Sequence, residues 1–142
     1  IVTIASLVER EAQVDSERAK IAGVIYNRLN NPSEFPYLQV DASVLYGLGR
    51  TSGPLSQEDL ASDTPYNLYT KQGLPPGPIC NPGYASLYAA AHPEQHNYYY
   101  YVAMPDGSHL FANSYEEHQT NIATSDAAQA AAAAENKEGT GE

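Results

Sequence analysis

Cysteine, tryptophan and positive charge are all scarce in this chain of 142 residues. The single cysteine, Cys80, cannot form an internal disulfide, so it says nothing about the redox compartment. Only 7 lysines and arginines stand against 17 aspartates and glutamates, which gives a formal charge of −10. This balance argues against a nucleic-acid partner or an anionic membrane surface, both of which require clustered positive charge.

Long apolar runs and the motifs of several common chemistries are also missing. No stretch of 18 apolar residues could span a membrane, and there is no phosphate-binding loop, G-x-G-x-x-G or G-x-S-x-G sequence. Pro93 separates His92 from His96 and disfavours a helix that would place both on one face. We therefore expect no metal site and no cofactor. Ser6 or Ser43 could act as a nucleophile, but cap or core roles suit them better.

Apolar spacing and turn residues predict an α+β fold. Asp15 and Ser16 are expected to cap the second helix. Residues 63–83 contain several prolines and glycines, and ordered irregular segments of this length are often functional. The predicted elements are helices at 1–13, 16–30, 42–48, 85–91 and 114–123, a helical turn from Ser56, and a strand–turn–strand over 98–113.

Composition also predicts where the folded domain ends. We expect one domain over 1–123, a length that is sufficient to bury a core. Residues 124–142 are rich in alanine and lack an apolar stripe, which predicts a frayed or disordered tail. The chain begins inside an apolar helical pattern and has no initiator methionine, so we expect a domain excised from a longer protein.

Glu11 stands where helix periodicity calls for a hydrocarbon side chain. In a helix over 1–13 it falls within an apolar stripe, whereas Glu9 points about 200° away. A desolvated carboxyl group keeps its proton above the usual pKa of about 4.3, as a general acid must. The alternative is a glutamate at the helix rim that reaches water or pairs with Arg10 or Arg18. The stripe consists of Ile1, Ile4, Leu7, Val8, Ala12 and Val14.

The next question is whether a second carboxyl group could act together with Glu11. An ordinary glycosidase needs two carboxyl groups facing one sugar, and Glu9 and Glu11 cannot form that pair, because helix residues two apart do not face each other. Asp41 could be the second group, or it could cap the helix that follows. Read from the residues alone, the sequence predicts a single acid at a polar cleft. Groups suited to binding sugar hydroxyls or peptide amides are offered by Asn67, Tyr69 and Thr70.

A series of short blocks occurs in a fixed order along the chain. They are ASLVERE at 5–11, SERAKIAGVIYNRL at 16–29, LQVD at 38–41, VLYGLG at 44–49, TPYNLYT at 64–70, GLPPGPI at 73–79, AAAHP at 89–93 and YYVA at 100–103. Together they closely resemble the catalytic domain of the YceG-like endolytic murein transglycosylases. The resemblance covers about residues 1 to 123.

The resemblance implies cleavage of the β-1,4 bond between N-acetylmuramic acid and N-acetylglucosamine within peptidoglycan glycan strands. The second glutamate of the S-x-x-E-x-E segment, here Glu11, would protonate the leaving oxygen. It would then accept the proton of the muramic acid C6 hydroxyl, which closes a 1,6-anhydro ring. The implied fold places helices around the glutamate helix beside a small antiparallel sheet, and it is distantly lysozyme-like by analogy. Family positions around the cleft match Gln39, Asn67, Tyr69 and Thr70.

Members of this family usually carry an N-terminal membrane helix and a small LysM-like module. The resemblance therefore implies a soluble fragment of an anchored parent at the extracytoplasmic face of the bacterial membrane. Its partners would be glycan strands and, as candidates, cell-wall synthases. Two alternatives stay open: a muramidase-type hydrolase that uses Asp41 as its second carboxylate, and a non-catalytic peptidoglycan-binding or scaffold module of the synthesis machinery.

Overall fold

A stripe of apolar side chains on the first helix starts the fold. Helix α1 spans Val2–Glu11 and buries Ile4, Leu7 and Val8, each at most 4% exposed. Burying one such side chain contributes about 1.5–3 kcal/mol to folding. The sequence predicted that Ile1 belongs to the buried stripe. This prediction is wrong, because Ile1 precedes the helix and is 67% exposed.

The computed structural model of the chain describes residues 1–140, with side chains as far as Ala134. Its architecture is α+β, as predicted from the sequence. The chain forms two compact units, one over Ile1–His96 and one that begins at Asn97. The sequence pattern did not indicate this division.

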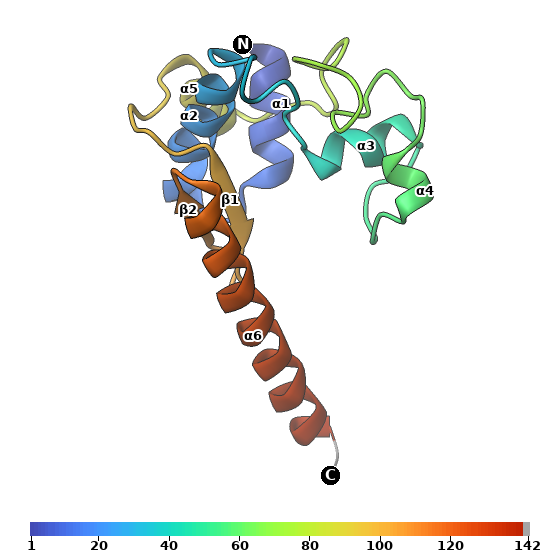
Figure 1. Cartoon of the computed structure of the whole chain (residues 1–142), viewed down its shortest axis with the longest axis vertical. Helices are drawn as coiled ribbons and strands as arrows, with labels where there is room; N and C mark the ends of the chain where they lie inside the picture. Colours follow the sequence, from blue (N-terminus) through green and yellow to red (C-terminus); the bar gives the residue numbers. More distant parts are fainter. Residues whose placement is uncertain (141–142) are drawn as a thin grey trace. The chain divides into compact units, whose positions relative to one another are not determined.

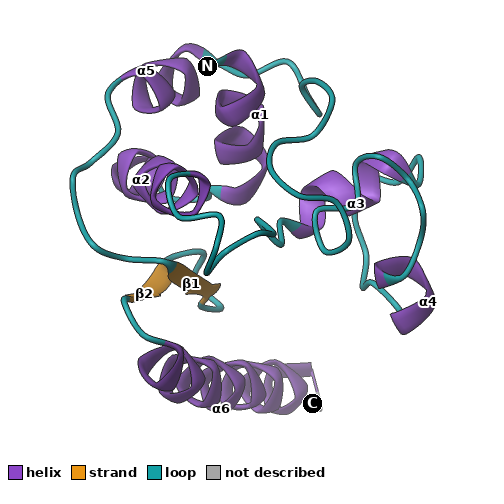
Figure 2. Ribbon diagram, turned by 45° about the horizontal axis from the view of Figure 1, so that its top comes forward, coloured by secondary structure: helices purple, strands orange, loops and turns teal. Residues whose placement is uncertain are grey.

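Helices make up the regular structure of the first unit. They are α1, the 3-10 turn η1 (Asp15–Glu17), α2 (Arg18–Leu29), α3 (Asp41–Gly47), α4 (Gln57–Leu60) and α5 (Tyr84–Ala91). Helix α1 packs against α2, α3 and α5, with α2 and α5 on one side and α3 on the other (Figures 1 and 2). Because α1 lies between these helices, side chains on its different faces meet different neighbours.

The start of α2 differs from the prediction that Asp15 and Ser16 cap it. The turn η1 runs directly into α2, whose N-cap is Glu17 and has no side-chain cap. Asp15 instead accepts two hydrogen bonds from the Arg18 guanidinium, at 2.9 and 3.2 Å. The preceding helical turn therefore takes the place of a cap.

The proline-rich segment is irregular, as predicted, and is tied to α1. Ile79 is 5% exposed, and its N–H donates to the Ser6 hydroxyl at 3.0 Å. The Ser6 hydroxyl donates in turn to the Thr3 carbonyl at 2.7 Å. Ser43 is equally buried and donates to the Tyr66 carbonyl at 2.7 Å. Both serines therefore have core roles, as the sequence favoured.

The second unit contains the predicted strand–turn–strand. Strands β1 (Tyr100–Ala103) and β2 (His109–Ala112) pair antiparallel and pack against helix α6 (Tyr115–Thr140). Helix α6 continues past Ala123, where the sequence predicted its end, because alanine has the highest helix propensity. It thus crosses the predicted boundary between domain and tail, and residues 141–142 of that tail lie outside the described residues.

No helix among the described residues has the length and apolar character needed to cross a membrane.

Gly23 allows the segment after α5 to lie directly on α2. A Cβ at this position would lie 2.5 Å from the Glu94 carbonyl oxygen and 2.6 Å from Nε2 of His96. Gly23→Ala should therefore lower the free energy of unfolding by about 1–3 kcal/mol, despite the helix preference of alanine. Thermal melts against Gly77→Ala test this, because a Cβ at Gly77 would meet only the Tyr66 hydroxyl, at 3.7 Å. Equal losses in the two variants would contradict it.

Candidate active site

Glu11 is the last residue of α1, and its side chain is half-buried. Burial, assisted by the negative charge of Asp41, raises the pKa of Glu11 to about 7. The N–H of Ala42 and the positive charge of Arg10 oppose part of this rise in pKa. Glu11 therefore keeps its proton to a higher pH than an ordinary glutamate does, in the direction that its place in the apolar stripe predicted.

Glu9 lies on the same helix in the opposite environment. Its carboxylate accepts hydrogen bonds from the Gly83 N–H at 2.8 Å, the Ser86 hydroxyl at 3.0 Å and the Arg18 guanidinium at 2.8 Å. These bonds, that of Gly83 foremost, hold the pKa of Glu9 below its usual range. Arg18 thus pairs with Glu9, and the alternative that it pairs with Glu11 is wrong.

Asp41 and Tyr69 form a pair beside Glu11. Asp41 is the first residue of α3, but it does not cap that helix, whose N-cap is Val40 without a side-chain bond. The exposed carboxylate of Asp41 instead accepts a hydrogen bond from the Tyr69 hydroxyl. Burial, followed by this bond and by the charges of Asp41 and Glu11, raises the pKa of Tyr69 above its usual value. Three ionisable groups from separate parts of the chain therefore act on one another here.

Asn67 builds the loop that carries Tyr69. The side chain of Asn67 is fully buried, and its amide nitrogen donates to the carbonyls of Leu60 at 3.0 Å and Ser62 at 2.8 Å. Its amide oxygen accepts the Tyr69 N–H at 3.0 Å. With these bonds made, Asn67 presents no atom to a ligand in this structure. Thr70, by contrast, is exposed, and its hydroxyl lies 3.4 Å from the Asn67 carbonyl.

Gln39 adopts a strained backbone conformation close to Asp41. Its φ of +57° lies in the left-handed region, and Gln39 is the one non-glycine residue with positive φ in the part of the chain that the structure describes. Such a conformation costs roughly 1–2 kcal/mol and often marks functional sites. The Gln39 N–H donates to the Leu68 carbonyl at 3.1 Å, which ties this segment to the loop of Tyr69. The side chain itself is exposed.

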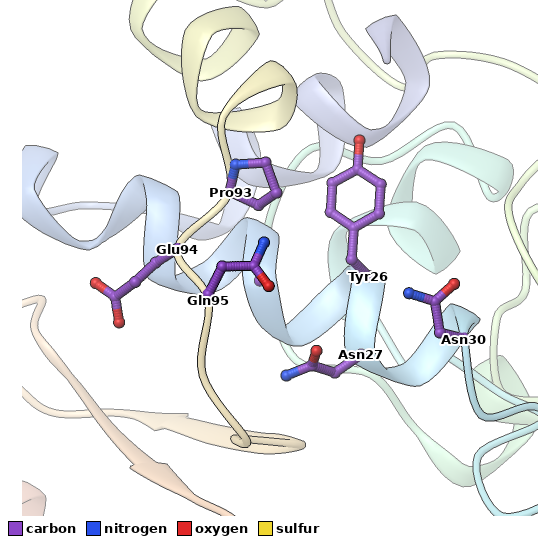
Figure 3. Close-up of a pocket in the computed structure, with 7 residues that line it drawn as sticks. Tyr26, Asn27, Asn30, Pro93, Glu94 and Gln95 are labelled. Carbon is purple, nitrogen blue, oxygen red and sulfur yellow. The ribbon is translucent and has the colours of Figure 1, made fainter.

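A small polar pocket of about 170 Å³ lies between α2 and the segment after α5 (Figure 3). Its tyrosine and one of its amides are already engaged: Tyr26 donates to the Ala90 carbonyl at 2.7 Å, and Asn27 to the His96 carbonyl at 2.9 Å. None of the predicted site residues lines it, so we do not place the active site there. The lining residues are Gly23, Tyr26, Asn27, Asn30, Pro93, Glu94 and Gln95.

Sequence reasoning missed the bond between Asp41 and Tyr69. The two residues are 28 positions apart in irregular or short elements, and no periodicity links them. Among residues 1–134, whose side chains the structure describes, no group of three or more His, Cys, Asp or Glu side chains could hold a metal ion. The raised pKa of Glu11, together with the neighbouring Asp41 and Tyr69, suits this site to acid–base chemistry.

Comparison with known proteins identifies the family. The model of the YceG-like family matches residues 1–124. The chain belongs to the YceG-like family. Its sequence is 43% identical over 118 residues to the endolytic murein transglycosylase of Bacillus subtilis (strain 168), covering 83% of this chain and 32% of that protein.

Two further proteins match the chain over most of its length. The endolytic murein transglycosylase of Streptococcus pneumoniae (strain D39) is 39% identical over 129 residues, covering 87% of this chain and 23% of that protein. A crystal structure of a yceG-like protein from Listeria monocytogenes matches with a TM-score of 0.77 and 42% identity, covering 83% of this chain and 38% of that one. This chain therefore spans about a third or less of the curated relatives that it matches.

Glu11→Gln should become stabilising as the pH rises. The pKa of Glu11 is about 7 in the folded state against a usual value of 4.5, so the folded state binds the extra proton between these values. The stability of the natural chain therefore falls as the pH rises through this window. We expect Glu11→Gln to be nearly neutral at pH 4 and stabilising by at most about 3 kcal/mol at pH 8 in thermal melts.

Glu9→Gln is the matched control for this measurement, and its pH dependence has the opposite sign. The pKa of Glu9 is lowered, so its contribution to stability is present above the usual pKa and is lost as the pH falls through the lowered one. Glu9→Gln should cost about 1–3 kcal/mol at pH 8 and less in acid. A lower melting temperature for Glu11→Gln at pH 8 would contradict the desolvated-acid interpretation.

The strain at Gln39 predicts a difference between two truncations. Gln39→Gly and Gln39→Ala both remove the amide, but only glycine adopts positive φ without a steric cost. Gln39→Gly should therefore be more stable than Gln39→Ala by about 1 kcal/mol in chemical denaturation. Equal stability of the two variants would show that the backbone at Gln39 is not strained.

Proposed function

We propose that this chain is the catalytic portion of a peptidoglycan lytic transglycosylase. The observation that carries the proposal is the place of Glu11 at the end of α1 beside Asp41, where burial first of all raises its pKa to about 7. Relatives named endolytic murein transglycosylase match the chain at 39% and 43% identity. Because the chain spans only part of their length, activity and substrate are inferred for it from this chemistry together with the likeness.

In the proposed reaction Glu11 acts twice. Its proton passes to the glycosidic oxygen between N-acetylmuramic acid and N-acetylglucosamine, and the bond from C1 to that oxygen breaks with its electron pair on the oxygen. The resulting carboxylate of Glu11 accepts the proton of the muramic acid C6 hydroxyl while that oxygen bonds to C1. The products are a free 4-hydroxyl on N-acetylglucosamine and a 1,6-anhydro ring, and Glu11 regains its proton.

A nucleophile within the substrate makes a second catalytic carboxylate unnecessary. A hydrolase would instead need a base to activate water, and the nearness of Asp41 to Glu11 makes that residue its candidate. The hydrogen bond from Tyr69 already occupies one oxygen of Asp41, which favours the transglycosylase. The second alternative, a non-catalytic binding or scaffold module, would leave the raised pKa of Glu11 without a role.

The substrate proposed is the glycan strand of peptidoglycan at the extracytoplasmic face of a bacterial membrane. With a formal charge of −10, the chain would hold such a strand by hydrogen bonds and rings instead of bulk charge. The predicted contacts are Gln39, Asn67, Tyr69 and Thr70, of which Asn67 is fully buried and would act by shaping the loop. Cell-wall synthases as partners and a distant likeness to lysozymes stay predictions.

Digestion of purified glycan strands tests this proposal. Mass spectrometry of the products should find 1,6-anhydro ends, and Glu11→Gln should lower the rate by at least about 100-fold while keeping the fold. Glu58→Gln, which changes an exposed carboxylate on α4, is the control and should leave the rate unchanged. Reducing ends would support the hydrolase. Unchanged cleavage by Glu11→Gln would remove Glu11 from the mechanism.

A further inference from the structure

The polar pocket on α2 contains none of the residues proposed for the chemistry, and its geometry suits a ligand. One wall is a single face of α2 and its C-cap, because Gly23, Tyr26, Asn27 and Asn30 follow one another at spacings of three and four residues. The facing wall is formed by residues 93–95, directly after α5 (Figure 3). All of these residues belong to the first unit.

Hydrogen bonds fix the two walls of the pocket to each other. The Glu94 N–H donates to the Ala19 carbonyl at 3.0 Å, and Nε2 of His96 lies 2.8 Å from the Lys20 carbonyl oxygen. Gly23 makes this close approach possible, because a Cβ there would lie 2.5 Å from the Glu94 carbonyl oxygen. The protein itself therefore holds the walls in place, which lowers the ordering cost of binding.

Two side-chain amides in the pocket are available to a ligand. Among the described residues, no group hydrogen-bonds to the side-chain amide of Asn30 or Gln95. Figure 3 shows the amide of Gln95 reaching toward α2 and the carboxyl group of Glu94 pointing away from it. Each amide offers two N–H donors and one carbonyl acceptor. The pocket can therefore both donate hydrogen bonds to a ligand and accept them from it.

The lining disfavours several kinds of ligand. It contains no lysine, arginine or histidine, so a phosphate or carboxylate group would find no positively charged partner. An apolar ligand would bury the amides without hydrogen bonds. The volume of about 170 Å³ is below the roughly 300–1,000 Å³ of sites for drug-sized ligands, so one small unit fits. A small neutral ligand with hydroxyl and amide groups satisfies all three limits.

We propose that this pocket is a second glycan-binding site, which holds one N-acetylated sugar unit of the strand through the amides of Asn30 and Gln95. Hydroxyl and acetamido groups donate and accept hydrogen bonds as side-chain amides do. The rings of Tyr26 and Pro93 supply apolar surface for the sugar ring. The inference rests on the proposed function, because that function makes a glycan strand the ligand.

An NMR titration with di-N-acetylchitobiose, a neutral dimer of N-acetylglucosamine, tests the site. The side-chain N–H signals of Asn30 and Gln95 should shift along saturable curves. Gln39 and Thr70 report the candidate active site in the same spectra. Shifts confined to Gln39 and Thr70 would restrict sugar binding to the active site and overturn the proposal, as would the absence of any shift.

Two truncations measure what the amides contribute. Asn30→Ala and Gln95→Ala should each raise the Kd of the pocket by about three- to tenfold, read from the amide that remains. Both side chains are exposed, so the variants should keep the fold. Gln57→Ala removes an exposed amide from α4 and is the matched control, with an unchanged Kd. The same Kd in all three variants would overturn the proposal.

Two further probes test which chemical groups the pocket recognises. Cellobiose lacks the acetamido groups and should bind at least about threefold more weakly than the N-acetylated dimer. Equal binding would contradict recognition of an N-acetylated unit. The amide of Nα-acetyl-lysine carries the amino group of a peptide side chain and should shift neither Asn30 nor Gln95. A saturable shift with this probe in place of the sugar would identify a peptide site and overturn the proposal.

Cleavage kinetics separate this proposal from the proposed function. With glycan strands, Gln95→Ala should raise KM and leave kcat unchanged, because the pocket touches no reacting atom. A fall in kcat at saturating substrate would contradict this role. A chain that binds the dimer but releases no anhydro ends would count against the proposed function alone. A chain that cleaves strands while Asn30 and Gln95 stay unshifted by the dimer would overturn only the second site.

Discussion

Partial burial of one carboxyl group, that of Glu11, is the constraint on which the candidate site depends. Helix α1 can hold a desolvated acid at its end because Ile4, Leu7 and Val8 anchor it in the core. The helix also carries Glu9, whose carboxylate is satisfied by three donors. One helix thus carries two glutamates, two positions apart, whose pKa values are shifted in opposite directions: that of Glu9 is lowered and that of Glu11 is raised.

Local patterns in the sequence were sufficient to predict this contrast. Helix phase is a property of the backbone, so Glu9 and Glu11 had to point in different directions once α1 formed. The strand–turn–strand and the short helix after Ser56 were confirmed for the same reason, because their signals lie within a few neighbouring residues. The predicted end of α6 was wrong. Alanine continues this helix through its high helix propensity, although the segment has no apolar stripe from which the helix could be predicted.

The surroundings of Glu11 depend on contacts that no local pattern encodes. Asp41 meets Tyr69 across 28 positions, through irregular segments whose path is set by tertiary bonds. Asn67 was expected to face a ligand because its amide is polar, yet it is buried with its amide fully engaged by the loop. Sequence resemblance located these residues near the acid. The structure was needed to distinguish the exposed side chains of Gln39 and Thr70 from the buried side chain of Asn67, which holds the loop.

If the chain acts as proposed, the placement of two unlike glutamates on α1 also limits the pH range of that activity. Acidification protonates Glu9 and weakens its hold on Gly83, Ser86 and Arg18, which loosens α5 and α2 from α1. Alkalinity takes the proton from Glu11 and leaves the fold without its acid. In the proposed mechanism, this one ten-residue helix therefore sets an acidic limit through the contacts of Glu9 and an alkaline limit through the proton of Glu11.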